Sequence, residues 1–186
     1  FASSGGGVMR GSEKVKLIAF DVDGTLTNGQ LIIGPEGEAY KCFNAHDGLA
    51  LSLAHRMGYK VGFITGRTSS IVERRAKELH CDFVLMGIKN KTEAMHHLLQ
   101  QFGLDWDASA YMGDDLNDLP LFSKVGVSGC PSNACVENRA MADFISRFKG
   151  GEGAGREFIE EILKSQGRWE EAVYSFREID QEELIQ

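Results

Sequence analysis

The sequence predicts an α/β fold of the Rossmann-like, doubly wound type, with a mainly parallel sheet, and three observations support this. Short apolar segments alternate with longer segments of helical periodicity from residue 15 onward. Polar residues stand where three of the apolar segments end, at Asp21, Thr65 and Asp114. The chain has 186 residues, a length that suits one domain. Repeated strand–helix units form parallel sheets with right-handed crossovers, so we expect helices on both faces.

The first elements can be assigned from local patterns. Residues 15–21 (VKLIAFD) form an apolar run that ends in a carboxylate, which is typical of a buried parallel strand. Residues 31–33 and 39–43 flank a Gly-Pro-Glu-Gly turn and predict a β-hairpin flap. Asp47 is then expected to cap a helix that runs to about residue 57, where Gly58 stops it.

The later elements follow the same alternation. A core strand is expected at 61–64, and Ser69 or Ser70 opens the next helix, to about residue 79. The remaining expected strands are 83–85, 108–112, 125–127 and 144–145, and the remaining helices are 91–101, 116–122, 133–139 and 157–163.

The ends of the chain differ from this pattern. Residues 1–13 are rich in Gly and Ser and contain Met-Arg-Gly-Ser, so we expect a tag or disordered leader there. The domain is expected to span residues 14–165. Residues 166–186 are strongly charged and are expected to form a C-terminal tail.

Composition excludes several classes of partner. The net charge of −7, with no basic stripe, argues against nucleic acid and against anionic membranes. No apolar run reaches the roughly 18 residues that a membrane span needs. The four cysteines are scattered, with no CxxC pair, which favours reduced thiols and a cytoplasmic protein.

Carboxylates gather at two of the predicted strand ends. Asp21 and Asp23 follow the first strand, and Asp114, Asp115 and Asp118 follow a later one. The carboxyl ends of parallel strands lie at one edge of a sheet, so up to five acids would share a small volume. A bound cation relieves their mutual repulsion, and oxygen ligands of this kind suit Mg²⁺.

This combination favours phosphoryl chemistry. A carboxylate can attack phosphorus and form an aspartyl-phosphate, and a second acid can protonate the leaving oxygen. The negative charge on the phosphoryl oxygens needs donors, which Thr65 and Lys91 can supply together with backbone N–H groups after Asp21.

Four segments resemble the motifs of the haloacid dehalogenase superfamily: DVDGT at 21–25, ITGR at 64–67, Lys91 at the start of a helix, and GDDLND at 113–118. The resemblance implies that Asp21 is the nucleophile and Asp23 the general acid/base. Thr65 and Lys91 would hold the phosphoryl group. The implied Mg²⁺ ligands are Asp21, Asp114 and the carbonyl of Asp23, with Asp115 and Asp118 in support.

A closer resemblance is to phosphatases of 3-deoxy-D-manno-octulosonate 8-phosphate, and to relatives that act on nine-carbon keto-sugar acid 9-phosphates. It rests on Phe43-Asn44 with Asp47-Gly48, on GGEGAGRE at 150–157 and on QGRWEEA at 166–172. It implies a small sugar-acid phosphate as substrate, in lipopolysaccharide biosynthesis. The implied substrate contacts are Asn44, His46, Gly66, Arg67 and Arg156.

Two departures leave the substrate open. Glu152 is reminiscent of the nine-carbon branch, whereas Arg67 resembles the octulosonate branch; His46 stands where many octulosonate enzymes have Arg or Lys. A catalytically silent oligomerisation module is a further alternative, because a related domain is appended to vertebrate sialic-acid-activating enzymes. The complete set of acids argues against that alternative.

The spacing of the motifs leaves no room for a cap domain. The intervals between Asp21, Thr65, Lys91 and Asp114 are 44, 26 and 23 positions, and a separate domain needs about 50 residues or more. The hairpin and the Gly-rich segment at 150–155 are therefore the candidates to cover the site. Relatives cover it by forming tetramers, so we expect a homotetramer in which a neighbour's flexible, Gly-rich tail reaches the site.

Overall fold

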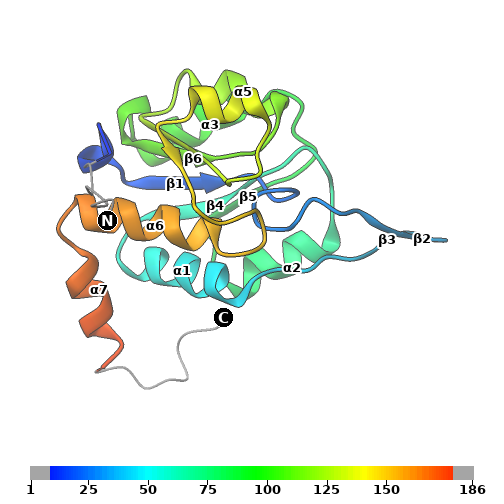
Figure 1. Ribbon diagram of the computed structural model, residues 1–186, viewed down its shortest axis with the longest axis horizontal. Helices are drawn as coiled ribbons and strands as arrows, with labels where there is room; N and C mark the ends of the chain where they lie inside the picture. Colours follow the sequence, from blue (N-terminus) through cyan, green and yellow to red (C-terminus); the bar gives the residue numbers. More distant parts are fainter. Residues whose placement is uncertain (1–8, 178–186) are drawn as a thin grey trace, which may run out of the picture.

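The computed structural model describes residues 9–177, and it confirms the expected α/β class. Figure 1 shows one sheet between two layers of helices, with a hairpin that projects past one end of the strands. The six strands are all parallel, in the order β5-β4-β1-β6-β7-β8. Their bounds are β1 Leu17–Phe20, β4 Lys60–Ile64, β5 Phe83–Leu85, β6 Ser109–Met112, β7 Val127–Cys130 and β8 Phe144–Ile145.

The helices form two layers, one on each face of the sheet (Figure 1). The α-helices are α1 Ala45–Arg56, α2 Ser70–Glu78, α3 Lys91–Phe102, α4 Leu119–Phe122, α5 Val136–Met141, α6 Ala154–Ser165 and α7 Trp169–Ser175. Short 3₁₀ helices occupy η1 Ser12–Lys14, η2 Trp106–Ala108 and η3 Leu116–Asp118. Two short antiparallel strands, β2 Ile32–Gly34 and β3 Gly37–Tyr40, make the hairpin. No separate cap domain occurs among residues 9–177.

Strand β1 feeds both cores, because successive side chains in a strand point to opposite faces. Ile18 and Phe20 pack with residues of α1, α2 and α6. Leu17 and Ala19 pack with residues of α3 and α4. All four are fully buried. The apolar run seen in the sequence therefore reflects a strand that is covered on both sides.

The order of the strands brings three strand ends together at one edge of the sheet. β1 lies between β4 and β6, and Phe20 is in register with Phe63 of β4 and Met112 of β6. The three strands consequently end at nearly the same level, just before Asp21, Thr65 and Asp114. The chain turns to opposite sides of β1 at this point, and such switch points are where ligands bind in open α/β sheets.

The first helix begins earlier than expected, and its cap is a different residue. Asn44 is the N-cap of α1, since its side-chain oxygen accepts hydrogen bonds from the N–H groups of His46 and Asp47. The prediction that Asp47 caps this helix was wrong. The Asp47 side chain is buried instead and contacts the start of α6.

The expected domain limits at residues 14 and 165 do not coincide with the limits of the packed chain. Met9 is only 7% exposed and belongs to the core cluster on the α1–α6 face. The Gln166 amide donates hydrogen bonds to the carbonyl oxygens of Ser12 and Val15. α7 also folds where a tail was expected, and its Ala172 is fully buried. Residues 1–8 and 178–186 of the expected leader and tail lie outside the described residues.

Among residues 9–177, no helix combines the length and the apolar character needed to cross a membrane.

Candidate active site

Three carboxylates converge where β1 and β6 end. Asp21 follows β1, Asp114 follows β6 by two residues, and Asp118 ends η3. One carboxylate oxygen from each lies within 4.8 Å of those of the other two. Asp21 is 7% exposed and Asp118 is fully buried. Three like charges with so little water are costly unless cations accompany them.

Lys91 supplies one such cation. It is the first residue of α3, and its Nζ lies 3.2 Å from Asp21 Oδ1 and 2.8 Å from Asp118 Oδ1. It also lies 3.1 Å from the hydroxyl oxygen of Tyr111, which projects from β6. Burial opposes the charged form of this lysine, but Asp21 and Asp118 outweigh it and raise the pKa of Lys91. The ammonium therefore stays charged beside Asp21.

Asp118 is held by donors on both of its oxygens. Oδ1 accepts from Lys91 and, at 2.5 Å, from the Tyr111 hydroxyl. Oδ2 accepts from the backbone N–H groups of Asp114 and Asp115, at 2.9 and 3.3 Å. Its capacity is largely used within the protein. Asp118 consequently fixes the loop that presents Asp114.

The electrostatics of Asp21 and Asp114 call for a further cation. Burial, and then repulsion by Asp118, raise the pKa of Asp21 to about 8, although Lys91 acts in the opposite direction. Burial and Asp118 also raise the pKa of Asp114 to about 6, against a hydrogen bond from Thr25. A divalent ion between the two carboxylates would reverse both shifts. Because the donors are all oxygen, they fit a hard ion such as Mg²⁺.

Asp23 lies in a second ion network, at the base of the hairpin. Its Oδ1 is 2.5 Å from Nζ of Lys41, and this Nζ is 2.9 Å from Glu38 Oε2. Arg67 approaches the same two acids at 4.0 and 3.9 Å. The Ser69 hydroxyl bonds to the other oxygen of Glu38. The network therefore joins the loop after β1 to β3 and to the loop before α2.

Sequence reasoning missed three members of these networks. Lys41 and Glu38 were assigned only to a hairpin, although an inward-facing Lys whose side chain is 2% exposed is rare in a flap. Alternation along the second hairpin strand was the one available indication. Tyr111 was assigned only to a buried strand, and nothing in the sequence indicates that its hydroxyl reaches Asp118.

The remaining expected site residues are distributed around this centre. Thr65 is 2% exposed, and its backbone N–H and C=O hold the strand end in place by bonding Leu85 and Ile88. Gly66 comes next along the same loop. Asp115 is exposed, and its Oδ1 accepts from the N–H of Leu116. His46 is exposed on the first turn of α1.

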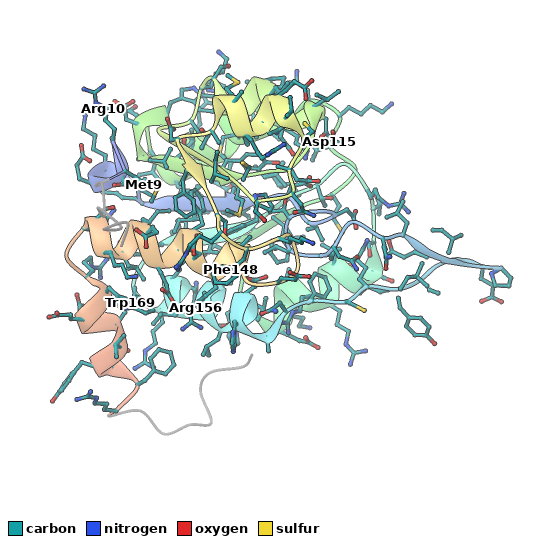
Figure 2. The ribbon with its side chains drawn as sticks, viewed as in Figure 1. Met9, Arg10, Asp115, Phe148, Arg156 and Trp169 are labelled. Atoms are coloured by element: carbon teal, nitrogen blue, oxygen red, sulfur yellow. The ribbon has the colours of Figure 1, made fainter. Side chains whose placement is uncertain are left out.

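Arg156 lies away from the carboxylates. Its Nε is 2.6 Å from Glu160 Oε1, and its guanidinium lies 5.9 Å from the centre of the Trp169 ring. Figure 2 shows Arg156 beside Trp169 in the lower helical layer, whereas Asp115 lies on the opposite layer near the strand ends. Within this chain, the guanidinium is thus paired with an internal acid.

The Gly-rich segment is tightly packed, contrary to the expectation of a flexible arm. A Cβ added at Gly150 would lie 1.9 Å from the carbonyl oxygen of Gly24. Gly151 has a φ of +77° and donates its N–H to the carbonyl of Thr25. These glycines allow one backbone to lie directly against another. The segment covers the loop after β1 in its own chain.

Known proteins share both this fold and much of the sequence. Residues 84–156 match the model of the haloacid dehalogenase-like hydrolase family. The 3-deoxy-D-manno-octulosonate 8-phosphate phosphatase KdsC of Escherichia coli (strain B / BL21-DE3) is 37% identical over 165 residues, which cover 89% of this chain and 88% of that protein. The corresponding Haemophilus influenzae enzyme is 36% identical over 84% of this chain and 87% of that protein.

Solved structures agree with these relatives. The Moraxella catarrhalis 3-deoxy-D-manno-octulosonate 8-phosphate phosphatase, crystallised with a magnesium ion, a phosphate ion and KDO, is 38% identical, with a TM-score of 0.87 over 91% of this chain and 97% of that one. A cobalt-bound Haemophilus influenzae phosphatase is 35% identical, with a TM-score of 0.83 over 86% and 93%. The chain therefore belongs to the haloacid dehalogenase-like hydrolases and, within them, to the family of 3-deoxy-D-manno-octulosonate 8-phosphate phosphatases.

Proposed function

We propose that this protein is a Mg²⁺-dependent phosphatase that converts 3-deoxy-D-manno-octulosonate 8-phosphate to 3-deoxy-D-manno-octulosonate and phosphate. The observation that carries the proposal is the buried Asp21 carboxylate, which lies 3.2 Å from the Lys91 ammonium and shares an acidic cluster with Asp114. Family membership supplies the substrate class.

The first chemical step falls to Asp21. A carboxylate oxygen of Asp21 forms a bond to phosphorus while the bond from phosphorus to the sugar oxygen breaks. Asp23 gives a proton to the departing sugar oxygen, which leaves as an alcohol. Lys91 limits the build-up of negative charge near Asp21, and the Thr65 hydroxyl and the N–H of Gly66 would hold phosphoryl oxygens.

The second step regenerates the enzyme. Asp23, now ionised, takes a proton from a water molecule as the water oxygen bonds to phosphorus. The bond between phosphorus and Asp21 breaks, and inorganic phosphate leaves. The Lys41 ammonium, 2.5 Å from Asp23 Oδ1, would help to hold the Asp23 side chain in place during this step.

The carboxylates of Asp21 and Asp114, with the carbonyl of Asp23, would hold Mg²⁺. When bound, the ion neutralises charge on the nucleophile and on the phosphoryl oxygens. Asp118 and Asp115 would support these ligands, since the backbone N–H groups of Asp114 and Asp115 are anchored on the Asp118 carboxylate.

The sugar-acid end of the substrate needs cationic or polar contacts. Arg67 is 45% exposed and its Nε lies 4.0 Å from Asp23 Oδ2, which makes its guanidinium a candidate partner for the substrate carboxylate. Asn44 and His46 at the start of α1 are further candidates. Arg156 would have to exchange Glu160 for a substrate carboxylate to take part.

A substrate panel tests the proposal. We expect release of phosphate from 3-deoxy-D-manno-octulosonate 8-phosphate in the presence of Mg²⁺, with a higher kcat/KM than for nine-carbon 9-phosphates. Asp21→Asn should release none while still unfolding in one cooperative thermal transition, which shows that the variant is folded. A higher kcat/KM for the nine-carbon compounds would assign the protein to the nine-carbon branch, which Glu152 resembles. If none of these compounds is hydrolysed, the remaining alternative is a catalytically silent oligomerisation module.

We also propose a homotetramer, and the sequence-based expectation of a cytoplasmic location stays a prediction. The hairpin supports assembly because its apolar side chains face outward: Ile33 is 59% and Tyr40 71% exposed. Apolar surface of this kind on a projecting element is typical of an interface. Light scattering that gives the mass of one chain for the active enzyme would exclude the tetramer.

A further inference from the structure

Asp47 caps a helix to which it does not belong. It lies in the first turn of α1, is 2% exposed, and its Oδ1 accepts a hydrogen bond of 2.9 Å from the backbone N–H of Arg156 in α6. The N-cap residue of α6 is Gly153, which has no side chain and a φ of +109°. Helix N-termini need acceptors for their first N–H groups. Asp47 provides one from another helix, and its charge suits the positive end of the α6 dipole.

The start of α6 is connected to the catalytic centre by backbone contacts. The Gly151 N–H donates to the Thr25 carbonyl at 3.3 Å, and Gly150 lies against Gly24. Gly24 in turn lies against Asp114, where an added Cβ would be 2.0 Å from Oδ2. The Thr25 hydroxyl donates to Asp114 Oδ1 at 3.0 Å. The loop after β1 is thus held between Asp114 and the Gly-rich segment.

Capping α6 with the buried Asp47 carboxylate lowers the stability of the folded protein. Its Oδ2 is buried and has no hydrogen-bond partner among the described residues. Burial raises the pKa of Asp47 to about 6, although the hydrogen bond from the Arg156 N–H and the nearby His46 and Arg156 side chains act in the opposite direction. A small cavity of about 10 Å³ lies beside Asp47, and Arg75 of α2 also lines it. Residues that lower stability in this way are commonly found where function requires them.

We propose that Asp47 is a positioning residue for the phosphatase reaction: by anchoring the start of α6, its carboxylate holds the Gly-rich segment against the loop that carries Asp23 and Thr25. The inference rests on the proposed function for its activity readout. It assigns Asp47 no contact with substrate or metal. Its effect passes through Gly150 and Gly151 to the ligand Asp114.

The test compares Asp47→Ala and Asp47→Asn with a matched control, Asp82→Ala. Asp82 also accepts a backbone N–H, from Val61, but it lies at the other end of the strands. We expect Asp47→Ala to lower kcat about tenfold with little change in KM, because a small displacement of catalytic groups is costly. The Mg²⁺ concentration for half-maximal activity, and for half of the Mg²⁺-induced rise in Tm, should increase about threefold or more.

The other two variants separate positioning from stability. Asp47→Asn keeps an acceptor oxygen and should recover kcat to within about threefold of wild type. Asp82→Ala should lower Tm without changing kcat or the Mg²⁺ response. Equal kcat and equal Mg²⁺ response in Asp47→Ala and Asp82→Ala would overturn the inference.

Two further readouts keep the outcome decisive. If wild-type protein releases no phosphate, the proposed function fails, while the Mg²⁺-induced shift in Tm still tests Asp47. If Asp47→Ala does not fold, hydrogen exchange on the wild-type protein decides. Coupling between sites is reciprocal, so Mg²⁺ should slow amide exchange at residues 150–156. Exchange there that is unchanged by Mg²⁺ would overturn the inference.

Discussion

Two ion networks flank the catalytic loop, and they are built differently. The inner network consists of Asp21, Lys91, Tyr111 and Asp118, and all four side chains are buried at the ends of core strands or in segments packed on them. The outer network consists of Asp23, Glu38, Lys41 and Arg67, and it joins the catalytic loop to the hairpin. In the outer network, the Asp23 side chain is 19% and the Arg67 side chain 45% exposed.

The difference shows how the loop after β1 can hold Asp21 rigidly and still allow Asp23 to adjust to a substrate. The inner network has core packing behind it, so Asp21, the proposed nucleophile, is held in one position. The outer network depends on a two-stranded ribbon, and an isolated ribbon of that kind is only marginally stable. Asp23 and its partners can therefore adjust as a substrate enters and leaves, while Asp21 stays fixed.

The largest effect is expected from the inner network. Lys91→Met keeps the apolar stem but removes the ammonium, which leaves Asp21 and Asp118 without their shared cation. We expect kcat to fall by about 10²-fold or more, since a preorganised charge at the reacting group is lost. Lys89→Met, an exposed neighbour, is the control and should keep wild-type kcat. A fall in kcat of less than tenfold for Lys91→Met would show that the two networks are of equal weight.

A smaller effect is expected from the outer network. Lys41→Met should lower kcat by about tenfold, because Asp23, the proposed general acid/base, loses the ammonium beside it and the hairpin loses its anchor. Steady-state kinetics against Lys77→Met, a surface lysine on α2, would check it. Turnover like that of wild type would mean that the contact between Lys41 and Asp23 does not contribute to catalysis.

The smallest effect is a change in thermal stability with pH. The folded-state pKa of Asp21, about 8, lies above the ordinary 3.8. Its contribution to stability is therefore complete below about pH 4 and is lost as the pH rises toward 8. Without divalent ions, Tm should fall between pH 5.5 and 8, by at least about 2 °C.

Magnesium should reverse this trend. An ion that binds only the folded protein stabilises it, and the gain grows as Asp21 becomes ionised. Differential scanning fluorimetry at both pH values, with Mg²⁺ or with EDTA, measures the effect, and Asp21→Asn should flatten both curves. Identical pH profiles with and without Mg²⁺ would contradict a cation site on this carboxylate.

Most members of the inner network were foreseeable, whereas the contacts that build the outer network were not. Asp21 stands at the end of an apolar strand, as do the neighbouring Thr65 and Asp114, so local sequence together with the rule for parallel sheets brings these residues to one edge. Lys41 contacts Asp23 because the base of the hairpin lies against the loop after β1, and no local pattern encodes that approach. The sequence indicates only that Tyr111 is a core residue of a buried strand. Its role in the inner network depends on its hydroxyl, which donates to Asp118 at the end of η3.

Two errors share one physical cause. The position of Asp47 in the sequence is typical of a helix N-cap. In the structure, Asn44 accepts the hydrogen bond at the start of α1 instead. The Asp47 side chain is therefore available to accept from α6, which lies more than 100 residues away in the sequence. The glycines at 150–153 have the composition of a flexible segment, yet they are needed because backbones touch there. In both cases a long-range contact decides between two conformations that local chemistry allows equally.

The position of β1 in the sheet also has a consequence for synthesis on the ribosome. β6, which pairs with one edge of β1, starts only at Ser109, and Asp118 and the Gly-rich segment come later still. A nascent chain that lacks these residues leaves one edge of β1 unpaired and has only Asp21 of the three clustered carboxylates. Competence to cleave phosphate esters thus arrives late, together with closure of the sheet, and an unfinished chain has no means to act on the cell's sugar phosphates.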